Sequence, residues 1–262
     1  MLALIAGRGE LPTVVAEALP TRPLVCALEH VAPTTLVPDY VFRLEKIGGL
    51  MRWLKVQGVT QICLCGAVRR PSFDWRELDV PTLLMVPRIL RALRRGDDGA
   101  LRIAIDMFEE AGFAVLAAHD AVPSLLPDAG TPTLSQPSVD AERLARIGDD
   151  VSAEQARDDL GQACIVARSG IAARETEAGT DAMLLAAGHE ATGGVLYKAP
   201  KLGQERRADL PAIGPETALK AAEAGLAGIV IEAGGVMVLN LEETLRRLDA
   251  EGLFLWIRER PE

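Results

Sequence analysis

Cysteine and histidine are scarce in this chain of 262 residues. The four cysteines form no CxxC pair, and three of them fall in strongly apolar runs, which predicts reduced thiols in the core of a cytosolic protein. The histidines, His30, His119 and His189, are too scattered to match the ligand spacing of a zinc site. The sequence therefore argues against zinc, and we expect any bound metal to have oxygen ligands.

Long hydrophobic runs and an excess of positive charge are also missing. No apolar segment approaches the roughly 18 residues that span a bilayer, and the N-terminus lacks the basic region and cleavage site of a signal peptide. A net charge of −9 argues against binding to a nucleic-acid backbone, which requires a basic face. We therefore expect a soluble, cytoplasmic protein with no nucleic-acid partner, and the sequence leaves peripheral contact with a membrane open.

What the first half of the chain does contain is a regular alternation of short apolar runs and helical patterns. The apolar runs are 2–6, 24–28, 61–65 and 113–117, and the helical patterns are 13–19, 44–57, 83–95 and 100–111. This alternation is typical of βαβ units that build a mostly parallel sheet. We predict a Rossmann-like N-terminal domain.

A stretch with four prolines between 123 and 137 suits a linker, because its other residues are mainly Gly, Ser, Thr and Asp. We place a boundary near Leu134, which gives domains 1–134 and 135–262. Beyond it we expect a hairpin at 163–175, further strands at 195–198, 227–232 and 253–257, and helices from 138, from 180, at 215–224 and at 241–251. The C-terminal domain is thus predicted to be α/β with strands of mixed direction.

The most informative segment is a polar loop at 198–215, which lies between apolar segments. Only five lysines occur in the chain, and two of them fall within four residues here. The charged residues of the loop are Lys198, Lys201, Glu205, Arg206, Arg207 and Asp209. Their net charge of +2 suits an anionic ligand, because Arg presents a planar fork to phosphate or carboxylate and Lys a mobile charge. The alternative is a solvated loop whose cations pair with neighbouring acids.

Glycines follow two of the predicted strands. Gly7 and Gly9 come after the first strand, where a glycine turn and the next helix can receive a phosphate. Gly66, with Arg69 and Arg70, comes after the third, at the carboxyl edge of the sheet where ligands of such folds collect. These five residues are candidate substrate-binding residues. The alternatives are tight turns or surface loops that bind no ligand.

The first glycine turn also leaves a nicotinamide-binding interpretation open. Glu29 follows roughly 20 residues later, at the end of the second predicted strand, where a dinucleotide-binding fold places the acid that binds the ribose. However, the turn lacks the third glycine of the GxGxxG pattern.

Acidic residues supply candidate metal ligands. Asp97 and Asp98 are adjacent on a loop before a helix, and Glu175 and Asp181 lie upstream of the basic loop. Such carboxylates can hold Mg²⁺ together with water and phosphate oxygens. One of the first pair could instead cap a helix, and the same alternative applies to Thr180, which is a further candidate substrate-binding residue. A mixture of carboxylates and cations is what phosphoryl transfer requires.

Two other segments are predicted not to belong to the site. Residues 148–150 repeat the Gly-Asp-Asp pattern at the end of an acidic helical stretch and are predicted to be ordinary surface. Residues 80–93 are apolar with interleaved arginines, which could contact lipid or an acyl chain. For this second segment we favour a core-facing amphipathic helix.

Short motifs run through the chain in a recognisable order: IAGRGELP, GAVRRP, GDD at 96–98, AHDAVPSLL, LGQA, EAGTDAML, KAPKLGQERRADLPAIGP and AGLAGIVIEAGGVMVL. In this order and spacing the chain resembles, over nearly its whole length, the UDP-2,3-diacylglucosamine pyrophosphatases of the I type, which are hydrolases of the lipid A pathway. One departure is Glu205, at a position where we associate the pattern with Asp.

The resemblance implies Mg²⁺-dependent hydrolysis of the pyrophosphate in UDP-2,3-diacylglucosamine, with water directed to the phosphorus on the sugar side. The products would be 2,3-diacylglucosamine 1-phosphate (lipid X) and UMP. It also implies two domains with the product held between them, and it is compatible with a homodimer and with peripheral contact at the inner membrane.

Residue roles follow from the same resemblance. Asp209 is the first choice for metal ligand or general base, and the next choices are Asp97, Asp98, Glu175 and Asp181. The residues that would hold the pyrophosphate are Lys198, Lys201, Gln204 and Arg207. Two rival functions remain at this point: a nicotinamide-dependent oxidoreductase, and a nucleotide-sugar-binding protein without catalysis.

Overall fold

The computed structural model describes residues 1–33, 35–68, 73–158, 160–201 and 203–260. By their internal contacts these residues form two compact units. The N-terminal unit consists of Met1–Pro123 together with Glu205–Asp209, and the C-terminal unit consists of Ser124–Gln204 and Leu210–Glu262. A short piece of the basic loop therefore belongs to the N-terminal unit, although it lies far along the sequence.

The division between the units falls at the start of the proline-rich stretch, directly after Pro123. Gly130 pairs with the last strand of the chain, and Thr133 Oγ1 accepts a hydrogen bond from the Leu255 N–H at 2.9 Å. The Leu134 N–H donates to Asp249 at 2.8 Å. These bonds fix the stretch to the C-terminal unit, so the predicted boundary near Leu134 lies inside that unit.

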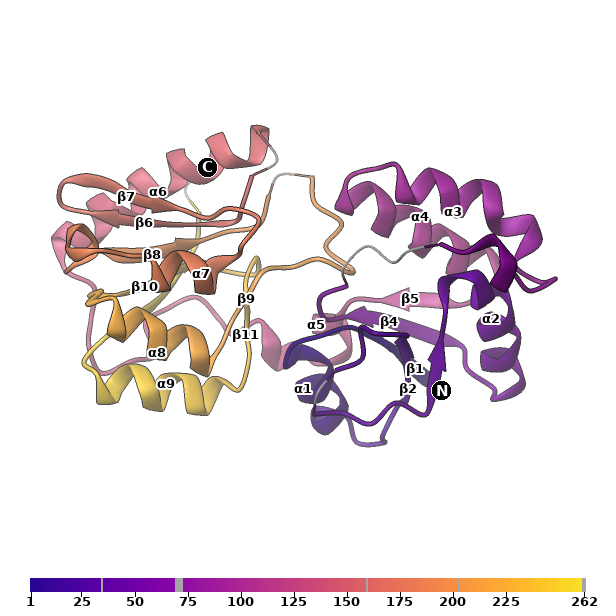
Figure 1. The fold of residues 1–262 in the computed structure, drawn as a ribbon. Coiled ribbons are helices and arrows are strands. Elements are labelled where there is room, and N and C mark those ends of the chain that lie inside the picture. Colours follow the sequence, from indigo (N-terminus) through magenta and orange to yellow (C-terminus); the bar gives the residue numbers. More distant parts are fainter. Residues whose placement is uncertain (34, 69–72, 159, 202, 261–262) are drawn as a thin grey trace. The chain divides into compact units, whose positions relative to one another are not determined.

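The N-terminal unit has the predicted Rossmann-like fold, with a parallel sheet of strand order β3-β2-β1-β4-β5 (Figure 1). The strands are β1 Leu2–Ala6, β2 Leu24–Leu28, β3 Tyr40–Phe42, β4 Gln61–Cys65 and β5 Ala114–Leu116. The α-helices are α1 Leu11–Ala18, α2 Ile47–Val56, α3 Val86–Leu93, α4 Asp97–Glu110 and α5 Ala118–Ala121. The 3-10 turns η1 Leu44–Lys46, η2 Trp75–Glu77 and η3 Leu83–Met85 precede or join the helices.

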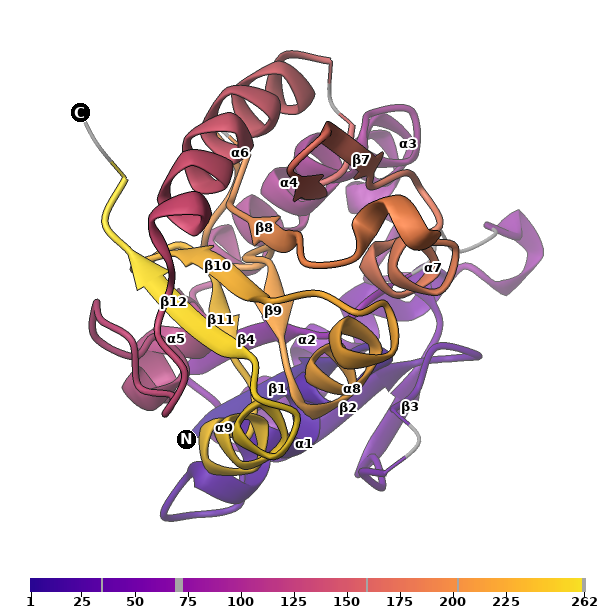
Figure 2. The same cartoon turned by 90° about the vertical axis from the view of Figure 1, so that its left-hand side faces the viewer.

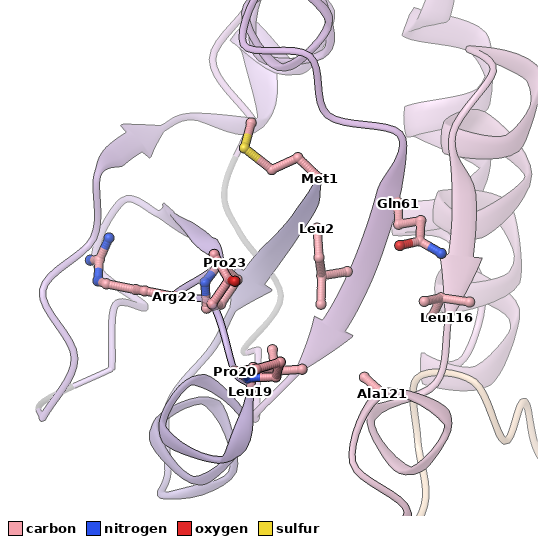
Figure 3. A pocket seen from close by; sticks show the side chains of 10 residues that line it. Met1, Leu2, Leu19, Pro20, Arg22, Pro23, Gln61, Leu116 and Ala121 are labelled. Carbon is pink, nitrogen blue, oxygen red and sulfur yellow. The ribbon is translucent and has the colours of Figure 1, made fainter.

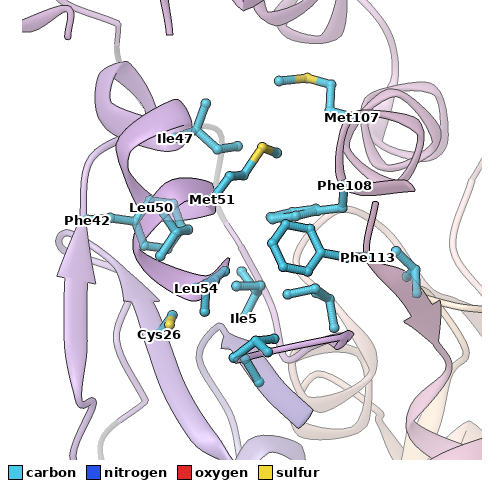
Figure 4. Close-up of a cluster of buried hydrophobic side chains, with 14 of the residues drawn as sticks. Ile5, Cys26, Phe42, Ile47, Leu50, Met51, Leu54, Met107, Phe108 and Phe113 are labelled. Carbon is cyan, nitrogen blue, oxygen red and sulfur yellow. The ribbon is translucent and has the colours of Figure 1, made fainter. Parts of the chain in front are cut away.

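Both faces of this sheet are buried. In Figure 4, Ile5 and Cys26 of the sheet lie in one cluster with Leu54 of α2 and Phe108 of α4. Leu4, whose side chain alternates with that of Ile5, is also fully buried. Nearly continuous apolar strands are what a parallel sheet covered on both faces requires. All four cysteines of the chain are free and buried, as predicted.

The C-terminal unit contains a sheet of order β12-β10-β8-β6-β7 (Figure 2). Strands β8, β10 and β12 are parallel, whereas β6 is antiparallel to both β8 and β7, which confirms the predicted mixed direction. The strands are β6 Ala163–Ala167, β7 Gly170–Arg174, β8 Val195–Lys198, β10 Gly228–Glu232 and β12 Phe254–Arg258, with a separate pair β9 Ala212–Ile213 and β11 Met237–Val238. The helices are α6 Val139–Arg157, α7 Thr180–Leu185, α8 Pro215–Glu223 and α9 Leu241–Ala250.

Helices cover both faces of this second sheet (Figure 2). Cys164 and Val166 of β6 pack with residues of α6, whereas Ile165 packs with residues of α7, α8 and α9 on the other face. Lys198, the last residue of β8, therefore belongs to a sheet whose two faces are both packed against helices.

Gly148 and Asp149 are not ordinary surface, contrary to the prediction, whereas Asp150 is exposed. Gly148 is buried, and a Cβ atom there would lie 2.4 Å from the ring of Tyr197. The Tyr197 hydroxyl donates to Asp149 Oδ1 at 2.6 Å, and Arg258 pairs with the same carboxylate at 2.8 Å. The segment is a structural contact between α6, β8 and β12.

A surface pocket of about 480 Å³ lies in the N-terminal unit at the amino ends of β1 and β4 (Figure 3). Met1, Leu2 and Gln61 line it, whereas the candidate glycines Gly7 and Gly66 follow the carboxyl ends of the same strands. The pocket contains none of the predicted site residues.

Among the described helices, none combines the length and the hydropathy required to cross a membrane.

Candidate active site

The glycine turns after β1 and β4 contact each other. Arg8 and Ala67 exchange two backbone hydrogen bonds of 2.8 Å, and the Gly7 N–H donates to Cys65 O at 2.8 Å. A Cβ on Gly7 would lie 2.5 Å from Ala67 O, so no side chain fits there. Gly66 has φ of +89° and similarly close backbone neighbours. Contact between the loops accounts for these two glycines, and their role in substrate binding stays a prediction.

The other candidates near these turns are less constrained. Gly9 has φ of +96°, and no described atom lies within 4 Å of the position that a Cβ would occupy there. Arg69 and Arg70 lie outside the described residues. Glu29, the acid of the nicotinamide interpretation, forms an ion pair with Arg43 at 3.6 Å, and its carboxylate lies 3.7 Å from His30 Nε2.

Glu205 anchors the part of the basic loop that belongs to the N-terminal unit. Its side chain is buried and accepts from Arg207 Nε at 2.8 Å and Nη2 at 3.0 Å, a bidentate pair that Arg102 Nη1 joins at 3.5 Å. The hydrogen bond from Arg207 lowers the pKa of Glu205, against the effect of burial. Arg207 also pairs with Glu109 at 2.8 Å. Glu205 thus has a structural role, and the predicted pyrophosphate ligand Arg207 is engaged by two carboxylates.

Asp98, a candidate metal ligand, connects the same loop to α4. Asp98 Oδ1 accepts from the Glu205 N–H at 2.6 Å, and Oδ2 accepts from Arg102 Nε at 2.8 Å. Asp97 is the first residue of α4, and the N-cap position belongs to Gly96, so the capping alternative for the aspartates is wrong. Since Asp98 already joins a helix to a loop, it is less suited to a metal than its sequence context suggested.

Asp209, the first choice for general base, closes this loop segment. Its backbone N–H donates to Glu205 O at 3.0 Å, as does that of Ala208 at 3.2 Å. Glu205 therefore positions Asp209 through one turn of backbone. The catalytic role of Asp209 stays a prediction.

Lys198 is the centre of a buried polar network in the C-terminal unit. It ends β8, is 7% exposed, and donates from Nζ to Thr180 Oγ1 at 2.8 Å and to Ala212 O at 3.0 Å. Burial lowers the pKa of Lys198, and the nearby carboxylates of Glu175 and Asp181 oppose that shift. A largely desolvated lysine is a strong electrostatic group for an anionic ligand, because little water screens it.

The network continues from Thr180 to the basic loop. Glu175 accepts from the Thr180 hydroxyl at 2.5 Å and also from the Gln162 N–H. Gln162 Nε2 donates to Gln204 Oε1 at 2.7 Å, and that same oxygen accepts from the Lys201 N–H at 3.1 Å. Five predicted residues therefore belong to one hydrogen-bonded chain: Lys198, Thr180, Glu175, Gln204 and Lys201.

Gln162 and Gly161 complete this network, although neither was among the predicted site residues. A Cβ on Gly161 would lie 2.5 Å from the Glu175 side chain, so glycine allows the carboxylate to approach the backbone at Gln162. The signal was present in the LGQA motif. Composition gave no reason to single it out, because neither residue is charged.

The carboxylate of Asp181 pairs with a residue outside the hydrogen-bonded network of Lys198. It is 57% exposed and pairs with Lys220 Nζ at 2.6 Å. Within the described residues, no three carboxylate, imidazole or thiol groups gather closely enough to hold a metal ion. Of the four predicted ligands, Asp97 and Asp98 belong to the N-terminal unit and Glu175 and Asp181 to the C-terminal unit.

Comparison with known proteins places these residues in a family. The model of the LpxI N-terminal domain matches residues 1–125, and the model of the LpxI C-terminal domain matches residues 128–256. The chain is also 37% identical over 270 residues to UDP-2,3-diacylglucosamine pyrophosphatase LpxI of Caulobacter vibrioides, an alignment that covers 97% of this chain and 96% of that protein. These matches leave the oxidoreductase alternative without support. The chain belongs to the LpxI family.

Proposed function

We propose that this protein hydrolyses the pyrophosphate bond of UDP-2,3-diacylglucosamine in lipid A biosynthesis and releases lipid X and UMP. The observation that carries the proposal is the 37% identity, over 97% of the chain, to a relative that is named for this activity. The two family matches span residues 1–125 and 128–256, so they include every candidate site residue.

In the proposed reaction the oxygen of a water molecule forms a bond to the phosphorus on the sugar side. The bond from that phosphorus to the bridging oxygen breaks, and UMP leaves with the bridging oxygen. Asp209 accepts the proton of the attacking water. Lys198 and Lys201 stabilise the negative charge that develops on the phosphate oxygens in the transition state. Such electrostatic stabilisation is usually the largest single contribution to the rate enhancement of an enzyme.

The Lys198 network supports this assignment. Thr180 and Ala212 O accept from Nζ, which fixes the ammonium group at the end of β8 before any ligand arrives. Glu175 fixes Thr180 in turn. A preorganised cation of this kind requires little rearrangement when negative charge develops beside it.

We also propose that activity depends on Mg²⁺, which would neutralise phosphate charge when bound. Mg²⁺ commonly takes only one or two carboxylates, with water and substrate phosphates as its other ligands. The absence of a three-acid cluster among the described residues is compatible with that pattern. Asp181, which is 57% exposed at the start of α7, is better suited to it than Glu175, because both oxygens of Glu175 already accept hydrogen bonds from Thr180 and Gln162.

The test is to incubate the protein with UDP-2,3-diacylglucosamine in detergent and to measure UMP, with Mg²⁺ or with EDTA. We expect UMP with Mg²⁺ and none with EDTA. UMP in both samples would retain the hydrolase and contradict the metal dependence. Binding of the substrate without UMP under either condition would favour the nucleotide-sugar-binding alternative.

A further inference from the structure

An exposed apolar turn precedes α3 in the N-terminal unit. Val80, Leu83 and Leu84 are 84%, 58% and 90% exposed. The Leu83 N–H donates to Val80 O at 3.3 Å, so the three side chains belong to one turn. Isolated exposed apolar residues are common, but adjacent large ones mark an interaction surface more often.

Helix α3 continues this turn with a basic face. The helix buries Val86 and Ile89 against the core and exposes Pro87 and Arg91. Arg94 and Arg95 follow at its C-terminal end and are also exposed. Since residues three, four and seven positions apart share a helix face, the exposed face changes from leucine to arginine along its length. We call Val80, Leu83, Leu84, Arg91, Arg94 and Arg95 the Leu84 surface.

No described residue forms an ion pair with Arg91, Arg94 or Arg95, whereas Arg88 of the same helix is paired with Glu110. Acids that precede the surface in sequence are engaged elsewhere. Asp79 accepts from the Thr82 and Gly49 backbone N–H groups, as the structure of that turn requires.

We propose that the Leu84 surface docks on an anionic lipid bilayer. Its leucines would enter the apolar boundary of the bilayer, while the arginines at the other end of the face bind anionic headgroups. Positive charge concentrated here, in a chain of net charge −9, matches the opposite sign of such a membrane.

The full chain can be tested by flotation with vesicles of phosphatidylcholine alone or mixed with phosphatidylglycerol. We expect binding only to the anionic vesicles, and weaker binding at high salt. The double variant Leu83→Gln/Leu84→Gln should bind at least about tenfold more weakly, and Arg91→Gln/Arg94→Gln/Arg95→Gln should lose the preference for phosphatidylglycerol. The control Leu134→Gln/Leu185→Gln changes two leucines that are 84% and 69% exposed in the C-terminal unit and should bind normally.

Three results would overturn the proposal: no binding of the unmodified chain to anionic vesicles, equal binding by the Leu83→Gln/Leu84→Gln variant, or self-association of the unmodified chain that this variant abolishes in the absence of lipid. The last result, measured by light scattering, would assign the surface to a second copy of the chain. UMP release from detergent-dispersed substrate should be the same in all these variants, so failure of docking and failure of the proposed hydrolysis are distinguishable.

Discussion

At the level of single residues, a buried charged side chain organises the candidate site residues in each unit. Glu205 is 8% exposed and holds the segment that ends at Asp209, whereas Lys198 is 7% exposed and joins Thr180 to the sheet. Each has partners that offset the cost of removing its charge from water. The two side chains therefore fix backbone positions on which the proposed chemistry depends.

Asp209→Ala is expected to lower turnover by about 10²–10³ or more, because it removes the proposed acceptor of the water proton. Its circular dichroism spectrum and melting temperature should match those of the unmodified protein. The control Asp158→Ala removes an exposed acid of the C-terminal unit and should leave UMP release unchanged. Near-normal activity of Asp209→Ala would exclude this residue from the mechanism.

Lys198→Met should separate catalysis from stability. We expect turnover to fall by about 10²–10³, since the cation at the end of β8 is lost. Burial lowers the pKa of Lys198 below its ordinary 10.5, so between the two values the unfolded chain binds more protons than the folded chain. The stability of the unmodified protein relative to Lys198→Met should therefore rise as pH increases through this interval.

Urea unfolding at a series of pH values from 7 to 10.5 measures this difference. A difference between the two proteins that stays constant with pH would contradict the lowered pKa of Lys198. Lys55→Met, which changes an exposed lysine of α2, controls for the loss of one positive charge and should retain full activity.

At the level of elements, the sequence predicted most of the fold. Strands β1, β2, β4 and β8 have the predicted bounds, because each is an apolar run that ends at a polar or glycine residue. Strand β3, Tyr40–Phe42, was missed, since three residues at the sheet edge carry too little periodicity to detect. The pair β9 and β11 was missed for the same reason.

The site was less predictable than the fold, because its contacts join residues that lie far apart in the sequence. The sequence pointed to Lys198, Thr180 and Glu175 as charged or capping residues, but only the structure joins them by hydrogen bonds. Asp98 and Arg207 had the right chemistry and proved to be engaged by Arg102, Glu205 and Glu109. Pairing between distant segments is decided by tertiary structure, which local sequence patterns do not encode.

Gly148→Ala tests the close packing of α6 on β8. Alanine favours a helix by about 1 kcal/mol over glycine, but its Cβ would lie 2.4 Å from the Tyr197 ring. We expect a net loss of about 1–3 kcal/mol in the free energy of unfolding, measured with urea. Asp150→Ala, an exposed position two residues later, should change it by less than about 0.5 kcal/mol. A Gly148→Ala variant at least as stable as the unmodified chain would contradict the close contact.

On the scale of the whole molecule, each unit has its own hydrophobic core. The N-terminal core includes Leu54 and Phe108, and the C-terminal cores lie on the two faces of the mixed sheet. Segment Glu205–Asp209 belongs with the first of these, since Ala208 packs against it. Local opening of the N-terminal unit should therefore also release this segment.

Leu54→Ala is expected to destabilise the N-terminal unit by about 2–5 kcal/mol, because Leu54 is fully buried. Hydrogen exchange should accelerate in peptides from 1–123 and also in the peptide that contains 205–209, while peptides from 163–198 keep their protection. Unchanged exchange in 205–209 would contradict its assignment to the N-terminal unit. Val56→Ala, an exposed change in the same helix, should leave all peptides as they are.

Because Glu205–Asp209 belongs to the N-terminal unit, no single cut in the chain separates the two units completely. The family models divide the chain after residue 125, yet a polypeptide that stops there lacks Glu205 and Arg207, which are the partners of Asp98, Arg102 and Glu109. The second polypeptide would carry a segment with nothing to bind. Produced together, the two pieces should therefore complement each other through that segment.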